Sequence, residues 1–400
     1  MRTTSLRPRL LAGMLATAGM LGACSAAGPE PASAPGTPGS SVETAAASPT
    51  PTPTQEPVTV TVVGSGDILP HQPVVRNANR NAGEVAGAYD FAPMFAEVAP
   101  LIKEADVAIC HLETPLSADN SNLGRPGTLI FNSPREVATG LRSSGFDGCD
   151  FASNHSWDLG LDGLAATIDV VEEAGLAYAG PQAEEPRARE AAIHEVDDVG
   201  IAHLAYTYSL LNNWGPNTEV PPEAPWTGKA MWPVVLAEGI IMDAGRARDD
   251  GADLVVVSMH WGEEYVATPT QDQREVAREL LESGTVDLIL GTHVHVIQPC
   301  ETINGRTVFY GLGNFLSNQS PDTTAGRLSP TTQEGMVARA TFTIDGDGTV
   351  TSTVDYQPTR VNLDGHVIEL ATPDVYPQTH ARTVATLASL GDGVCDATPR

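Results

Sequence analysis

Side chains that can bind metal ions or transfer protons recur at the ends of short apolar runs in this sequence. Five such runs, near residues 58–63, 105–110, 149–152, 253–259 and 286–290, are followed by polar residues of this kind: Asp67; His111 and Glu113; Asn154 and His155; His260; and His293 with His295. Six of the ten histidines lie in these stretches if His71 is counted with Asp67. Histidines placed at random would not cluster in this way, so the sequence predicts one shared polar site.

The residue types define the chemistry of that site. Aspartate, glutamate, asparagine and histidine offer oxygen and nitrogen donors without a thiolate, a set that suits Mn, Fe, Zn or Mg. A carboxylate can bridge two such ions, and the ion pair then activates water and stabilises both oxygens of a displacement. The sequence contains no GxxxxGK[ST], GxSxG or HExxH motif, and no second carboxylate suggests a glycosidase pair. We therefore predict a centre for divalent metal ions.

The elements that must position these residues alternate between strands and helices. Apolar periodicity predicts helices over FAPMFAEVAPLIKEAD and near 134–143, 161–171, 235–249 and 271–283, between the strands named above and a further strand at 307–311. In open α/β sheets, ligands bind beyond the carboxyl ends of the strands, so separate segments deliver their polar residues to one place. GMVARATFTI and TVTSTVDYQ, joined by DGDG, predict an added antiparallel hairpin.

A resemblance to a known family rests on six motifs in a fixed order. GDILPH, CHLETPLS, SNHSWDLG, HWGEEY, GTHVHVIQP and YGLGNF, within roughly residues 60 to 320, resemble the CapA family of poly-gamma-glutamate capsule synthesis proteins. That family is a branch of the calcineurin-like metallophosphatase superfamily. The resemblance implies an α/β fold of four layers, in which two packed mixed β-sheets are flanked by helices and two metal ions bind at the strand ends.

The resemblance also implies a role for each matching residue. Asp67 and His295 match ligands of the first metal ion, and Glu113 takes the place of the bridging carboxylate. The residues that match ligands of the second ion are Asn154, His260 and His293.

Three further residues match positions near the metal ions. His155 matches a histidine that is not a ligand but contacts the substrate oxyanion or protonates the leaving group. Asp158 either orients His155 or caps the following helix. Asn314 of GLGNF supports the site or forms a turn.

Two departures from the family pattern concern the metal centre. Metallophosphatases usually carry Asp-x-His in the first motif, whereas this chain has Asp67, Ile68 and Leu69, so that only His71 could substitute as a ligand. The CapA pattern commonly has asparagine before Leu-Glu, where this chain has His111. An extra metal ligand, a substrate contact and a packed residue are all open for His111.

The N-terminal segment predicts export and anchoring. Residues 1–23 have the arginines, apolar run and small residues of a signal peptide, and Leu21 to Cys24 resemble a lipobox in which Cys24 is lipidated. Residues 24–57 have the composition of a disordered stalk, followed by a domain over 58–370 and a tail over 371–400. The four remaining cysteines allow two disulfides in three connectivities, with unpaired core thiols at Cys110 and Cys149 as the alternative.

Charge limits the partners. The formal net charge of -28 repels phosphate backbones, which excludes nucleic acid, and disfavours a polyanionic substrate unless metal ions change the local field. Our leading hypothesis is a membrane-anchored lipoprotein of the cell envelope that makes, exports or anchors a polymer such as poly-gamma-glutamate through a hydrolase-type metal site, with the polymer or its precursor and other capsule-synthesis membrane proteins as partners. The alternatives are a metallophosphoesterase acting on a phosphorylated envelope intermediate and a non-catalytic assembly subunit.

Overall fold

The computed structural model describes residues 56–124, 129–212 and 218–400. The predicted signal peptide, Cys24 and nearly all of the predicted stalk lie outside the described residues. Within these ranges, no helix is both long enough and apolar enough to cross a membrane.

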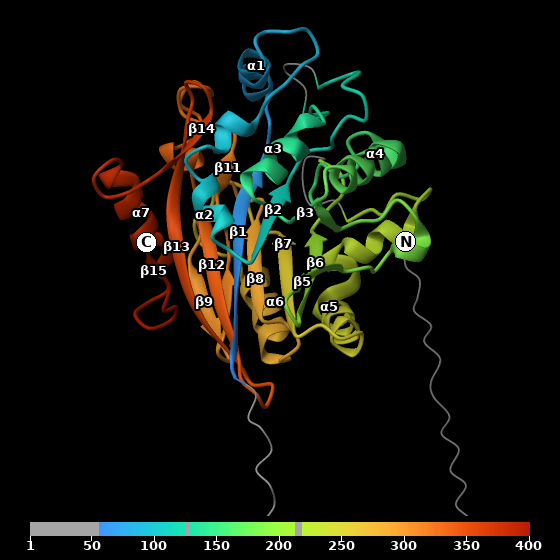
Figure 1. The fold of residues 1–400 in the computed structure, drawn as a ribbon, viewed down its shortest axis with the longest axis vertical. Coiled ribbons are helices and arrows are strands. Elements are labelled where there is room, and N and C mark those ends of the chain that lie inside the picture. The colour runs from blue at the N-terminus through green and yellow to red at the C-terminus, as the bar shows by residue number, and fades with distance from the viewer. Residues whose placement is uncertain (1–55, 125–128, 213–217) are drawn as a thin grey trace, which may run out of the picture. The chain divides into compact units, whose positions relative to one another are not determined.

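The first β-sheet combines a parallel half and an antiparallel half (Figure 1). Its strands are, in spatial order, β14 (Val367–Leu370), β13 (Val350–Asn362), β12 (Glu334–Ile344), β1 (Val58–Ile68), β2 (Val107–Leu112), β3 (Gly148–Asp150) and β4 (Ala177–Ala179). From β1 to β4 the strands are parallel, whereas β12 runs antiparallel to both β1 and β13. Two short strands join the sheet at other points: β11 (Asn314–Leu316) beside β1 and β15 (Thr398–Pro399) beside β13. The β12–β13 pair is the predicted hairpin, which the structure confirms.

The second sheet is also mixed. Its spatial order is β5 (Ala192–Val196), β6 (Val199–Thr207), β7 (Leu254–His260), β8 (Leu288–Thr292), β10 (Arg306–Phe309) and β9 (Cys300–Ile303). The four central strands are parallel, and each edge strand is antiparallel to its neighbour. The carboxyl ends of β6, β7, β8 and β10 therefore lie at one edge of this sheet. The site residues that follow β7 and β8 lie at that edge.

The alternation of side chains along the strands builds three apolar layers. Val60 and Val62 of β1 pack in one buried cluster with Val256 of β7 and Leu290 of β8, so the two sheets pack face to face. The outer face of the first sheet is covered by α1 (Gln72–Asn81), η1 (Ala92–Phe95), α2 (Ala99–Lys103), α3 (Glu136–Ser144) and α4 (Gly160–Glu173). The outer face of the second sheet is covered by α5 (Trp232–Asp249) and α6 (Gln271–Glu282). The predicted four-layer α/β architecture is confirmed.

One predicted helix is divided. The segment FAPMFAEVAPLIKEAD forms η1 and the short helix α2 instead of a continuous helix. Pro100 lies in the first turn of α2, where proline is tolerated because its missing N–H would have no helical partner, whereas inside a longer helix it removes a hydrogen bond. The predicted apolar face survives the break, since Met94, Phe95 and Ile102 are fully buried.

The last thirty residues are attached to the rest of the domain by strand pairing of β15 with β13 and by a disulfide. They contain α7 (Pro377–Leu387) and β15, and Cys395 forms a disulfide with Cys300 of β9. The second disulfide joins Cys110 of β2 to Cys149 of β3. Unpaired thiols at these two positions are therefore the wrong alternative, and the connectivity that spacing left open is 110–149 with 300–395.

Candidate metal centre

The predicted site residues meet where five parallel strands end. Asp67 is the penultimate residue of β1, Glu113 follows β2, His260 ends β7, and His293 follows β8. Asn154 lies four residues beyond β3. All the predicted ligands apart from His71 are buried: Asp67, Glu113, Asn154, His260, His293 and His295. Strands from both sheets thus contribute to one buried polar cluster.

One group of three donors consists of Asp67, Glu113 and His295, whose ligand atoms lie within 4.8 Å of one another. His295 Nδ1 is 3.1 Å from Asp67 Oδ2, and its Nε2 is 3.6 Å from Glu113 Oε1. Asn314 Oδ1 also lies 3.1 Å from His295 Nδ1, while its Nδ2 donates to the Thr332 carbonyl. Asn314 therefore supports the site by orienting a predicted ligand.

The remaining predicted ligands lie beside this group. Asn154 Oδ1 is 3.1 Å from His260 Nε2, and the rings of His260 and His293 are 4.6 Å apart. The backbone N–H of His293 donates to Asp67 Oδ1 over 3.1 Å. A second group of three donors, Asp67, His111 and His260, shares Asp67 with the first.

The backbone at the site adopts conformations that sequence patterns do not reveal. His293 and His295 have φ angles of 87° and 57°, in the left-handed region that costs free energy for residues other than glycine. Gly66 lies so close to the residue that precedes β11 that a Cβ there would be 1.9 Å from the carbonyl oxygen of Gly313. The next residue, Asp67, contacts both histidines that follow β8.

The donor set fits divalent ions. Glu113 Oε2 and His293 Nδ1 are buried without a hydrogen-bond partner among the described residues. Burying such polar atoms without a partner costs free energy of folding. A carboxylate oxygen and an imidazole nitrogen are both atom types that coordinate metal ions. Asp67, Glu113 and His295 would hold one ion, and His260, His293 and Asn154 a neighbouring one that also lies within reach of Asp67.

Electrostatics at the site also favour a cation. Burial raises the pKa of Glu113 to about 7. Burial would lower the pKa of His295, but the neighbouring carboxylates of Glu113 and Asp67 raise it to about 10. Burial would raise the pKa of Asp67, yet its hydrogen bond with His295 holds it below the usual value. His293 has its pKa lowered to about 3, chiefly by burial, so its imidazole is a neutral donor. His295 thus carries a proton in a position that a cation can occupy.

His155 lies next to the metal-binding groups without joining either. Its Nδ1 is 2.8 Å from Asp158 Oδ2, which also accepts the backbone N–H of Phe131. Asp158 makes no capping bond to α4. Of the two interpretations of Asp158, the structure therefore supports the one in which it orients His155.

His71 belongs to neither group of three within the described part of the chain. Its Nδ1 lies 3.0 Å from the Leu69 carbonyl oxygen and 3.3 Å from the backbone nitrogen of Asn318. Its ring is in edge contact with Phe131, which in turn contacts the ring of His155. His71 thus lies near His155, and its predicted role as a ligand stays a prediction.

Two site residues were missed by sequence reasoning. Asn212 Nδ2 lies 3.2 Å from His155 Nε2, and the Tyr208 ring lies 4.6 Å from the ring of His293. Both follow β6, whose end carries no cluster of histidines or carboxylates. The signal in the sequence was the position of Tyr208 directly after the largely apolar segment VGIAHLAYT, which forms β6.

The fold and the site define a four-layer α/β protein with candidate metal-binding groups at its strand ends. A family profile described as bacterial capsule synthesis protein PGA_cap matches residues 61–319. The chain belongs to this family.

Curated relatives carry related names. The chain is 30% identical over 278 residues to the capsule biosynthesis protein CapA of Bacillus anthracis, which covers 69% of this chain and 64% of that protein. It is 27% identical over 227 residues to the PGA biosynthesis protein CapA of Bacillus subtilis, which covers 56% of this chain and 57% of that protein. The chain thus spans less than two thirds of the length of either relative.

Solved structures with a similar arrangement include phosphatases. A calcineurin-like phosphoesterase, YfkN of Bacillus subtilis, aligns with a TM-score of 0.44 and 16% identity over 83% of this chain and 99% of that chain. A phosphatase of Mycoplasma pneumoniae aligns with a TM-score of 0.41 and 17% identity over 75% of this chain and 94% of that chain.

Proposed function

We propose that this protein is an extracytoplasmic lipoprotein that cleaves or transfers bonds of an envelope polymer such as poly-gamma-glutamate at a site for two divalent metal ions. The observation that carries the proposal is the buried group of Asp67, Glu113 and His295 beside the His155–Asp158 pair. Membership of the capsule synthesis family supports the choice of polymer. The names of the Bacillus relatives, which refer to capsule and PGA biosynthesis, support it too.

The residues of the chain divide the work of a hydrolysis. Asp67, Glu113 and His295, with His260, His293 and Asn154, would hold divalent ions that polarise a substrate oxygen and activate a water. Asp158 accepts a hydrogen bond from His155 Nδ1, and His155 Nε2 lies on the other side of the ring, beside the amide of Asn212. At this atom a proton can be held and passed to the leaving group.

The acidity of the chain makes the polymer proposal testable. A protein with a formal charge of -28 repels polyglutamate unless cations reverse the field at the site. We expect the purified chain to bind poly-gamma-glutamate when loaded with Mn²⁺ or Zn²⁺ and to lose that binding after chelation. Binding that survives complete metal removal would contradict this route.

Activity is tested on two bond types. The metal-loaded chain is incubated with poly-gamma-glutamate, with shortening measured by size-exclusion chromatography, and with a phosphodiester. We expect shortening that is lost in His155→Ala and Asn154→Ala. Cleavage of the phosphodiester alone would assign a metallophosphoesterase. A metal-free protein whose two variants support wild-type polymer production would refute both enzymatic functions and leave the assembly subunit.

Anchoring is a separate part of the proposal. The lipobox-like sequence before Cys24 supports a lipid anchor, and the two disulfides support export, because such bonds persist in oxidising compartments. We expect wild-type protein in the membrane fraction with a lipid mass on Cys24, and Cys24→Ser protein outside that fraction. An unmodified Cys24 in the exported wild type would refute the anchor.

A further inference from the structure

His111 is the site residue for which the family resemblance gives no role. It lies opposite Asp150 in the parallel register of β2 and β3. Their side chains meet at 2.6 Å between His111 Nδ1 and Asp150 Oδ1, and both are buried. The other carboxylate oxygen of Asp150 has no hydrogen-bond partner among the described residues. Asp150 is therefore committed to His111.

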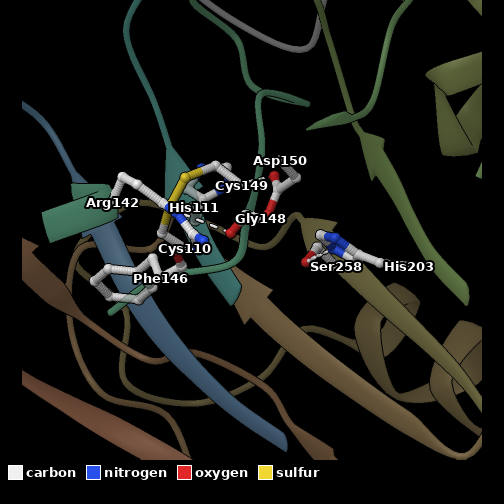
Figure 2. The surroundings of a disulfide bond; sticks show 9 residues. All are labelled: Cys110, His111, Arg142, Phe146, Gly148, Cys149, Asp150, His203 and Ser258. Atoms are coloured by element: carbon white, nitrogen blue, oxygen red, sulfur yellow. Dashed lines mark hydrogen bonds and ion pairs between the residues drawn. A yellow bond between two sulfur atoms is a disulfide. The ribbon is translucent and has the colours of Figure 1, made fainter. Parts of the chain in front are cut away.

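A disulfide fixes this pair in place. Cys110 and Cys149 precede His111 and Asp150 by one residue each and are also opposite each other, with their Cα atoms 4.4 Å apart. Because strand side chains alternate between faces, the disulfide packs under the helices while the histidine and aspartate face the other way. Figure 2 shows the bond with His111 and Asp150 directly beside it. A one-residue slip between β2 and β3 would separate the pair, and the covalent bond prevents it.

The second ring nitrogen of His111, Nε2, faces the metal centre. With Nδ1 held by Asp150, Nε2 would offer its lone pair to an ion that displaces the proton shared with His260. Nε2 lies 3.0 Å from His260 Nδ1 and 3.9 Å from Asp67 Oδ1. Asp67, His111 and His260 offer three ligand atoms within 4.8 Å of one another. A histidine held by a carboxylate on one nitrogen, with the other turned to acidic and imidazole donors, has the arrangement of a metal ligand.

We propose that His111 is a metal ligand at this centre, with Asp67 and His260, and that Asp150 is the positioning residue that sets its tautomer. This inference rests on the proposed metal site. It also accounts for the departure in the first motif. Leu69 stands where metallophosphatases usually have histidine and cannot bind a metal through its side chain, so His111 supplies a nitrogen donor from the neighbouring strand.

The test measures metal binding and not turnover. The full chain is stripped of metal and titrated with Co²⁺, following the visible absorption of the bound ion and the stoichiometry. His111→Gln is compared with His203→Gln, which replaces a buried histidine of β6 that pairs with Ser258 over 2.8 Å and belongs to neither donor group. We expect His111→Gln to bind one Co²⁺ fewer, or to bind one Co²⁺ at least about 100-fold more weakly, with an altered absorption spectrum. We expect His203→Gln to match the wild type in Co²⁺ affinity, stoichiometry and absorption.

A second variant guards against misfolding. Asp150→Asn keeps the shape of the side chain and removes its charge. We expect this variant to bind Co²⁺ about 10- to 100-fold more weakly with unchanged stoichiometry. If thermal unfolding shows that His111→Gln is not folded, the Co²⁺ affinity of Asp150→Asn tests the role of His111 instead. A wild-type chain that binds no Co²⁺ refutes the proposed metal site itself. A wild-type chain that binds Co²⁺, with His111→Gln and Asp150→Asn indistinguishable from His203→Gln, overturns the role of His111.

Discussion

Acidification should weaken metal binding steeply, because the ligands of one group hold protons that the ion must displace. His295 has a pKa raised to about 10 by Glu113 and Asp67, against the opposing effect of burial, so it is protonated at neutral pH. Burial raises the pKa of Glu113 to about 7, so it takes up a proton as the pH falls below neutrality. The pKa of Asp67 is lowered, so it contributes no proton.

The magnitude follows from these pKa values. Between pH 8 and pH 6, competition at His295 weakens binding by a factor of about 100, since one proton is displaced throughout. Protonation of Glu113 adds a factor of about 10 over the same interval. The ion held by Asp67, Glu113 and His295 should therefore bind about 1000-fold more weakly at pH 6, or about 4 kcal/mol.

Calorimetric titration with Mn²⁺ tests this expectation. Repeating the titration in buffers of different ionisation enthalpy counts the protons released, which should approach two at pH 6 and one at pH 8. Glu113→Gln should bind more weakly and release fewer protons than the wild type at pH 6, because it lacks the Glu113 proton and the charge that raises the pKa of His295. The stability of the metal-free protein should change in the direction opposite to the metal affinity. Both groups have raised pKa values, so their stabilising contribution is present at low pH and is lost as pH rises through about 7 and about 10. An affinity that changes less than tenfold between pH 6 and pH 8 would refute the assigned ligands.

The remaining predictions concern catalysis and stability. His155→Ala should lower kcat for polymer cleavage by a factor of about 100 to 10,000 with unchanged metal content, and Asp158→Asn should do so less strongly; loss of metal from either variant would place His155 among the ligands instead. Gly66→Ala should destabilise the fold by about 1–3 kcal/mol in urea unfolding and weaken metal binding, because the added methyl group displaces the strand that carries Asp67; wild-type values for both would contradict the close approach. Replacing Cys300 and Cys395 by serine should cost about 4–5 kcal/mol, given the sequence separation of 95 residues, and should leave metal affinity unchanged; a loss of affinity at equal stability would link this bond to the site.

The sequence determined which residues could do chemistry and where along the strands they fall. The apolar runs predict strands because their length and composition suit buried parallel sheets, and polar residues after them predict a site at the carboxyl ends. Asp67, Glu113, Asn154, His260 and His295 were predicted on this basis, and the structure gathers all five. The order of the six motifs along the chain indicated the family, and this inference does not depend on the three-dimensional structure.

The tertiary structure alone decided which of these residues touch. Asp67 and His295 lie 228 residues apart and meet because two sheets pack face to face, a relation that local periodicity does not encode. Asp158 orients His155 because the fold brings its carboxylate to His155 Nδ1 and to the backbone N–H of Phe131, and α4 begins at Gly160 without a side-chain cap.

Strand register settled the rest. It places Cys110 against Cys149 and His111 against Asp150, across 39 residues of chain in each case. Spacing could not choose among the disulfide connectivities or assign His111, since both depend on which strand lies beside β2 and at what offset. The sequence thus supplied the donors, and long-range packing brought them together and aimed them.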